Sequence, residues 1–128
     1  MSRLIRFATA PGQRRLWRVL LAVLLVAITW LALVPNPPRA VSTGWDKSNH
    51  ALAFASLAFA SVWAVWPRPR QWGWLAATLL AYGGAIEIAQ SFLPPRTGDW
   101  WDLLADGCGI ALGLLAAWPV AAGAARQR

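Results

Sequence analysis

Four long apolar runs, separated by proline-containing breaks, constrain the fold of this chain more than any other feature of its sequence. The runs are Val19 to Val34, Ala51 to Trp66, Trp72 to Leu93 and Trp101 to Gly123, with prolines at 35, 37, 38, 67, 69, 94 and 95 between them. At a rise of about 1.5 Å per residue, such runs make helices about 24 to 33 Å long, close to the hydrocarbon thickness of a bilayer. Because lipid cannot pair backbone polar groups, each run is predicted to be a transmembrane helix.

The composition supports this prediction. The 128 residues are 58% hydrophobic, include ten tryptophans, and have a mean hydropathy of +0.44, values typical of a membrane protein. We predict an all-α fold, a four-helix transmembrane bundle with spans at about 17–34, 48–66, 72–93 and 101–122. This single domain, 17–123, is flanked by a basic tail, 1–16, and a short tail, 124–128. The first run exceeds the roughly 7 to 15 residues of a signal peptide core, so it is interpreted as an uncleaved helix.

The basic residues predict the orientation of the bundle. If both termini are cytoplasmic, only Arg39, Lys47 and Arg96 lie outside, and the other nine of the twelve Lys and Arg lie inside. Such an asymmetry is typical of a membrane protein with both termini in the cytoplasm, an N-in/C-in topology. Most of the basic residues behind the net charge of +7 then lie in short cytoplasmic segments that face anionic lipid. The charge therefore does not indicate a nucleic-acid partner, and none is expected.

All five acidic residues gather toward the predicted outer end of the bundle. Residues three or four apart share a helix face, so the polar residues form one stripe on each helix. The stripes are Asp46, Lys47 and His50; Glu87 and Gln90; and Asp99, Asp102 and Asp106. An ionisable group at the centre of a membrane helix costs about 2.5 to 3.5 kcal/mol on insertion scales. The three stripes are therefore predicted to meet in one polar cluster, with Arg96 bridging two carboxylates.

Small residues accompany these stripes. Gly109 and Gly113 continue the last stripe in a small-xxx-small pattern that lets helix backbones approach closely. Gly83 and Gly84, just before Glu87, are predicted to permit tight packing or a bend. These four glycines are the predicted helix-packing residues.

The ordered set of motifs resembles the VanZ-like membrane proteins. The motifs are Asp46-Lys47-x-x-His50, Glu87-x-x-Gln90, Arg96-x-x-Asp99-x-x-Asp102 and Asp106-x-x-Gly109-x-x-x-Gly113. The likeness covers Asp46 to Gly113, and the first span matches only as a generic preceding helix. The family pattern has Asn where this chain has Asp106, a departure that adds a negative charge. The resemblance implies a bacterial inner-membrane protein near cell-envelope chemistry, in a family named for teicoplanin resistance.

Three classes of function fit the polar cluster. In the leading hypothesis it binds or gates a polar or anionic headgroup, and Lys47, Arg96 and His50 meet the phosphate. The alternative is a hydrolase of a lipid-linked substrate, with His50 or Glu87 as general base and Asp102 or Asp106 orienting it or holding a divalent metal. In the third class the cluster only locks helices together, or onto a partner membrane protein or a second copy.

The individual residues also have structural explanations. Asp46 could cap the second span, Asp99 or Asp102 could cap the fourth, and His50 could be a hydrogen-bonded structural residue. The chain has no Gly-x-Ser-x-Gly elbow, HExxH pair or phosphate-cradling loop. A binding role is therefore favoured over an enzyme, which stays open as the alternative, and no metal or cofactor is predicted.

The catalytic candidates, should the site react, are His50, Glu87 and Asp102. The expected partner is a membrane lipid or a lipid-linked envelope precursor. The predicted binding residues are Asp46, Lys47, His50, Glu87, Gln90, Arg96, Asp99, Asp102 and Asp106.

Overall fold

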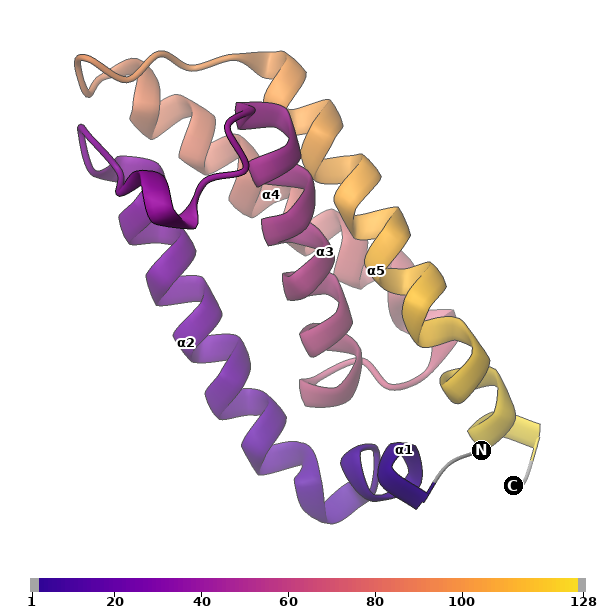
Figure 1. The fold of residues 1–128 in the computed structure, drawn as a ribbon. Helices are drawn as coiled ribbons and strands as arrows, with labels where there is room; N and C mark the ends of the chain where they lie inside the picture. Colours follow the sequence, from indigo (N-terminus) through magenta and orange to yellow (C-terminus); the bar gives the residue numbers. More distant parts are fainter. Residues whose placement is uncertain (1–2, 127–128) are drawn as a thin grey trace.

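The computed structural model describes residues 3–126, which form four main helices and no strand (Figure 1). These helices are α2 (Arg14–Leu33), α3 (Asp46–Ala64), α4 (Trp72–Ser91) and α5 (Trp100–Arg126). The short elements are α1 (Arg3–Ala8) and the 3-10 turns η1 (Pro11–Gln13), η2 (Arg39–Val41) and η3 (Pro69–Gln71). The all-α prediction is confirmed. The outermost residues of the two predicted tails, 1–2 and 127–128, lie outside the described part of the chain.

Two segments are long and apolar enough to cross a membrane, Pro11–Leu33 and Trp100–Arg126. Their outward faces are strongly apolar: Val26 on α2 is 72% exposed and Leu115 on α5 is 68% exposed. No residue of α2 is buried within the protein. Apolar side chains that no protein surface covers indicate a membrane protein. Helix α3 begins with five polar residues, and for this reason it is less hydrophobic than α2 and α5.

Helices α3 and α5 form the most extensive contact of the bundle. Gly109 and Gly113 on α5 face α3, where a Cβ atom at either position would overlap the carbonyl oxygen of Ala51 or Ala55. The absent side chains therefore let the two backbones touch. Buried Phe54, Leu57 and Ile110 lie in the apolar core beside this contact.

Helix α4 packs on α5 next to this core. A Cβ atom at Gly83 would overlap Oδ2 of Asp106 and lie 3.2 Å from the Phe54 ring. At Gly84 an added Cβ would meet no atom within 4 Å. Of this pair, only Gly83 lies at a close helix contact.

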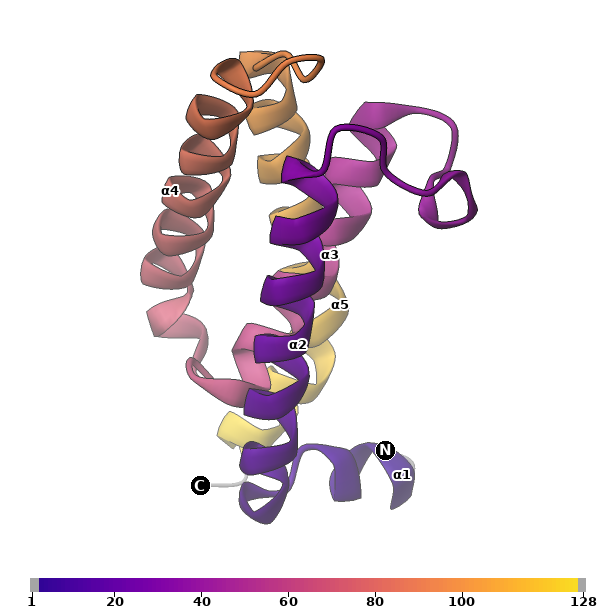
Figure 2. The ribbon, with the colours of Figure 1, turned by 90° about the vertical axis from the view of Figure 1, so that its left-hand side faces the viewer.

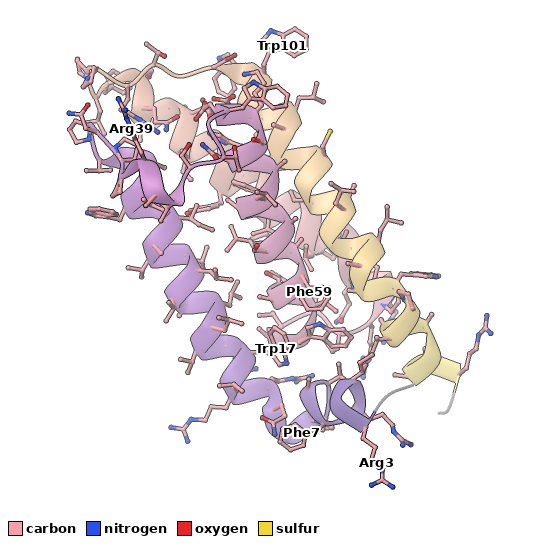
Figure 3. The ribbon with its side chains drawn as sticks, viewed as in Figure 1. Arg3, Phe7, Trp17, Arg39, Phe59 and Trp101 are labelled. Carbon is pink, nitrogen blue, oxygen red and sulfur yellow. The ribbon has the colours of Figure 1, made fainter. Side chains whose placement is uncertain are left out.

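Helix α2 packs mainly against α3. Trp17 and Phe59 meet edge to face with ring centroids 5.8 Å apart (Figure 3), and Arg18 Nε donates to the Ala64 carbonyl at 3.1 Å. Trp17 Nε1 also donates to the Ala8 carbonyl at 2.6 Å. This bond ties α1 to the start of α2.

The two ends of the bundle differ in chemistry. Helix α1 and the end of α5 lie at one end, and the α2–α3 and α4–α5 connections lie at the other (Figures 1 and 2). Because α3 and α5 begin at this second end and α4 ends there, the acidic stripes of all three helices come to one height. The candidate functional site lies at this second end of the bundle.

Candidate functional site

Lys47 connects α3 to α5. Its Nζ lies 2.8 Å from both Asp99 Oδ2 and Asp102 Oδ1. Asp102 is 2% exposed, so Lys47 supplies the charge partner that a buried carboxylate needs. The hydrogen bond from Lys47 lowers the pKa of Asp99, which lies in the loop before α5.

His50 lies one turn further along α3, between the carboxylates of α5. Its Nδ1 is 2.8 Å from Asp106 Oδ1, and its Nε2 is 3.6 Å from Asp102 Oδ2 and 3.9 Å from Asp46 Oδ2. Both ring nitrogens thus face acidic oxygens, which hold the plane of the imidazole. A histidine oriented in this way can accept a proton, bind a cation or donate to an anion.

Glu87 joins the cluster from α4 and is 2% exposed. Its Oε2 accepts the backbone N–H of Asp99 at 2.8 Å. Gly98 allows the loop to come this close, since a Cβ there would lie 2.6 Å from the Glu87 carbonyl oxygen. Oε1 of Glu87 and Oδ2 of Asp106 are buried without a hydrogen-bond partner among residues 3–126.

The three stripes therefore meet, but two residues of the predicted set lie apart from the carboxylate network. Gln90 turns toward α2 and donates from Nε2 to the Ala32 carbonyl at 2.9 Å. This bond satisfies one of the carbonyls that the end of a helix leaves unpaired.

Arg96 was expected to bridge two carboxylates, and this expectation is wrong. Within the described chain Arg96 forms no ion pair or side-chain hydrogen bond, and Lys47 is the bridging cation. The reason is geometric, because Asp99 and Asp102 face α3, whereas Arg96 lies beside a groove on the α2 side.

The helix-capping interpretation applies to one acid. Asp99 Oδ1 accepts the backbone N–H of Trp101 at 2.9 Å and so caps α5. Asp46 is the first residue of α3, and no side chain caps that helix. Instead, Thr43 and Asn49 bond to each other across the turn that precedes it.

A groove of about 310 Å³ opens beside the cluster, between α2, α3 and the loops above them. Its walls are mostly apolar, including Leu24, Ile28 and Leu52. Its polar rim includes Asp46, Asn49, His50 and Arg96. The groove thus combines an apolar lining with a charged mouth. The contribution of α2 was missed in the sequence because its apolar residues look the same whether they face lipid or a groove.

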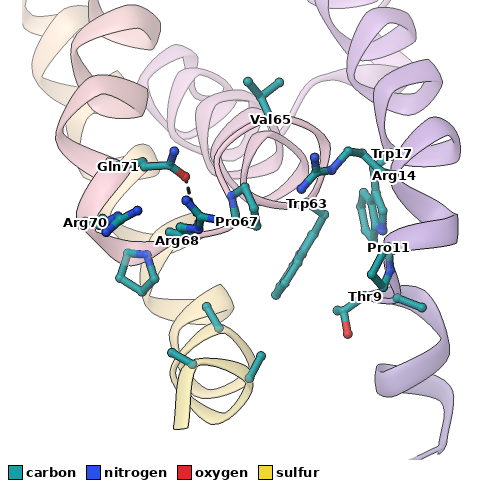
Figure 4. A pocket seen from close by; sticks show the side chains of 15 residues that line it. Thr9, Pro11, Arg14, Trp17, Trp63, Val65, Pro67, Arg68, Arg70 and Gln71 are labelled. Carbon is teal, nitrogen blue, oxygen red and sulfur yellow. Dashed lines mark hydrogen bonds between the residues drawn. The ribbon is translucent and has the colours of Figure 1, made fainter. Parts of the chain in front are cut away.

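A second cavity, of about 880 Å³, lies at the opposite end of the bundle (Figure 4). Arg14, Arg68 and Arg70 line it together with Trp17 and Trp63. It contains none of the acidic stripes and lies at the end that carries most of the basic residues. Its chemistry is that of a cationic, aromatic membrane boundary.

The Lys47–Asp99 pair predicts a pH dependence of stability. Because folding lowers the pKa of Asp99, its stabilising contribution is complete above the ordinary value near 3.8 and is lost as the pH falls through the lower folded value. We expect the wild-type protein and Asp99→Asn to differ in melting temperature at pH 7 and to converge as the pH falls through the lowered pKa of Asp99. Thermal unfolding in detergent over this range measures the difference. A constant offset at every pH would contradict the assignment.

A family profile described as VanZ/LLP1 matches residues 29–122. No curated protein and no solved structure gives a match. The matched region contains α3, α4 and nearly all of α5, and thus every residue of the polar cluster. The chain belongs to the VanZ/LLP1 family.

Proposed function

We propose that this VanZ/LLP1 protein binds the anionic headgroup of a membrane lipid, or of a lipid-linked envelope precursor, at the extracytoplasmic face of a bacterial inner membrane. The groove beside the cluster carries this proposal, because it offers an apolar wall together with a charged mouth that includes the guanidinium of Arg96. A lipid has the same two parts, an acyl chain and a polar head. A soluble anion has no apolar part that could pack against this wall.

The charges around the groove identify the residue that meets the headgroup. Lys47 is engaged by two carboxylates at 2.8 Å, whereas Arg96 forms no close ion pair among residues 3–126 and has only a longer-range attraction to Asp46. A guanidinium group can hold a phosphate through two parallel hydrogen bonds. His50 on the same rim is the second donor in this proposal.

The orientation of the bundle is part of the same proposal. The site end carries Arg39, Lys47 and Arg96, and the opposite end carries the remaining basic side chains of the described chain. The positive-inside rule then favours cytoplasmic termini and an extracytoplasmic site. Labelling an engineered Thr97→Cys with a membrane-impermeant thiol reagent in intact cells, in a Cys108→Ala background, tests this orientation.

The binding proposal predicts a specific loss in Arg96→Ala. Removing a charge-assisted hydrogen bond costs about 1.5 to 3 kcal/mol, so affinity for a short-chain phosphatidylglycerol should fall about tenfold or more. Native mass spectrometry or a fluorescent-lipid titration in detergent measures it. Arg39→Ala is the control, because Arg39 is exposed at the same end but does not line the groove. Unchanged lipid affinity in Arg96→Ala would refute the proposal.

A second pair of variants tests the groove itself. Ser56 lines the groove, and Thr78 lies on α4 outside it; both are exposed, and both hydroxyls bond to the carbonyl four residues earlier. A tryptophan at Ser56 should block lipid binding, and a tryptophan at Thr78 should leave it intact. Equal affinities of the two variants would place the lipid elsewhere.

A further inference from the structure

Two buried carboxylate oxygens of the cluster are left without a partner. Oε1 of Glu87 and Oδ2 of Asp106 accept no hydrogen bond in the described chain, although the residues are only 2% and 0% exposed. An unpaired acceptor in an apolar interior is costly, and a buried charge is more so. Such oxygens require a partner, which can be a proton, a hydrogen-bond donor such as water, or a cation.

Glu87 and Asp106 lie close together where α4 packs on α5. Asp106 Oδ2 is directed at Gly83 of α4, where a Cβ atom would collide with it. Glu87 lies one turn above Gly83 on the same face of that helix. His50, Glu87 and Asp106 each offer a ligand atom within 4.8 Å of the other two.

The surroundings of His50 complete the coordination pattern. With Nδ1 directed at Asp106, the opposite nitrogen, Nε2, faces the carboxylates of Asp102 and Asp46 at 3.6 and 3.9 Å. A histidine that binds a metal usually donates its other ring N–H to a carboxylate, which orients the ring and raises its basicity. Asp102 occupies the position of that supporting carboxylate.

The local charge balance also favours a divalent ion. Lys47 is engaged with Asp99 and Asp102, which leaves Glu87 and Asp106 with His50 alone. One dication beside a neutral imidazole would balance both carboxylates. Two ligands of a tetrahedral Zn²⁺ lie about 3.3 Å apart, a spacing that small side-chain rotations reach from the observed separations.

We propose that His50, Glu87 and Asp106 bind one divalent transition-metal ion of the Zn²⁺ class. One imidazole nitrogen with two carboxylate oxygens suits Zn²⁺, whereas Mg²⁺ and Ca²⁺ prefer six or more oxygen ligands. Three protein ligands leave a coordination position free. The inference does not rest on lipid binding in the groove. The sequence, which lacks a recognised metal motif, suggested a divalent metal only within the hydrolase alternative and did not predict this ligand set.

The test uses the full chain in detergent. Any affinity tag is removed first, and a chelator then removes bound metal. Zn²⁺ alone is titrated in competition with a chromophoric chelator, and the bound metal is counted by mass spectrometry. We expect one Zn²⁺ per chain, little competition from excess Mg²⁺, and at least tenfold weaker binding in Glu87→Gln and Asp106→Asn. The Co²⁺-loaded protein should show a visible absorption band that His50→Ala abolishes.

Two control variants separate this site from its neighbours. Asp46 forms an alternative set with His50 and Asp102, and Cys108 is an exposed thiol. Cys108→Ala should keep wild-type Zn²⁺ affinity, and Asp46→Asn should weaken Zn²⁺ binding less than Glu87→Gln does. Loss of binding in Cys108→Ala, or a larger loss in Asp46→Asn than in Glu87→Gln, would move the metal away from Glu87 and Asp106 and overturn the assignment.

The wild-type titration decides the question even if the buried variants do not fold. Absence of stoichiometric Zn²⁺ binding would overturn the metal proposal. Because no lipid is present, that result would leave the headgroup proposal intact. Conversely, Arg96→Ala should lose lipid affinity and retain Zn²⁺.

Discussion

Lys47→Ala is expected to destabilise the protein by about 3 kcal/mol. The substitution strands the carboxylate of Asp102, which is buried, without the charge that now lies 2.8 Å away. Breaking a buried ion pair from one side typically costs about 3 to 5 kcal/mol. We expect a cost at the lower end of this range because the Lys47 side chain is 33% exposed, so water can reach the space that it leaves. Thermal or denaturant unfolding in detergent, followed by tryptophan fluorescence, measures the loss.

A double-mutant cycle identifies the origin of this loss. If the cost comes from the stranded carboxylate, Lys47→Ala combined with Asp102→Asn should be more stable than Lys47→Ala alone. Arg39→Ala, which removes an exposed charge at the same end, should change stability by less than about 0.5 kcal/mol. Additive effects of the two substitutions would show that Lys47 and Asp102 do not depend on each other.

Gly109→Ala is expected to destabilise the contact between α3 and α5 by about 2 kcal/mol. The added methyl group would overlap the carbonyl oxygen of Ala51, a backbone atom that can move only if the helices separate. Overpacking of this kind typically costs about 1 to 3 kcal/mol. A lower melting temperature of the purified protein is the measurement.

Gly84→Ala is the matched control for this prediction. It is also a helical glycine, but a Cβ there meets no atom within 4 Å. Since alanine favours a helix by about 1 kcal/mol over glycine, Gly84→Ala should be neutral or stabilising. Opposite signs for the two substitutions are therefore expected. A Gly109→Ala protein as stable as the wild type would show that α3 and α5 are not in contact at this point.

The shared position of the two proposed sites has a functional consequence. His50 lies in the proposed metal triad and also on the rim of the groove. A cation at the triad would place positive charge beside the proposed headgroup site, so Zn²⁺ and an anionic lipid should bind more tightly together than separately. Lipid titration with and without Zn²⁺ measures this coupling.

Much of the fold was predictable because lipid imposes a simple rule on sequence. The four apolar runs between prolines predicted four helices, and α2 to α5 lie at these runs. Of the four predicted membrane spans, only those of α2 and α5 are long and apolar enough to cross a membrane in the described chain. The convergence of the three acidic stripes was also predicted, since a spacing of three or four places each stripe on one helix face. The family was recognisable from the same residues and is confirmed.

The partner of each charged side chain was decided only by tertiary structure. Both Lys47 and Arg96 lie near the acids in sequence order, and only the packing of α3 on α5 shows that Lys47 is the bridging cation. The groove could likewise not be predicted from the sequence of α2, because its apolar residues can face lipid or another part of the protein. Periodicity specifies the face on which a residue lies, but the distance between two faces depends on contacts such as Gly109 against Ala51, which arise only when the helices pack.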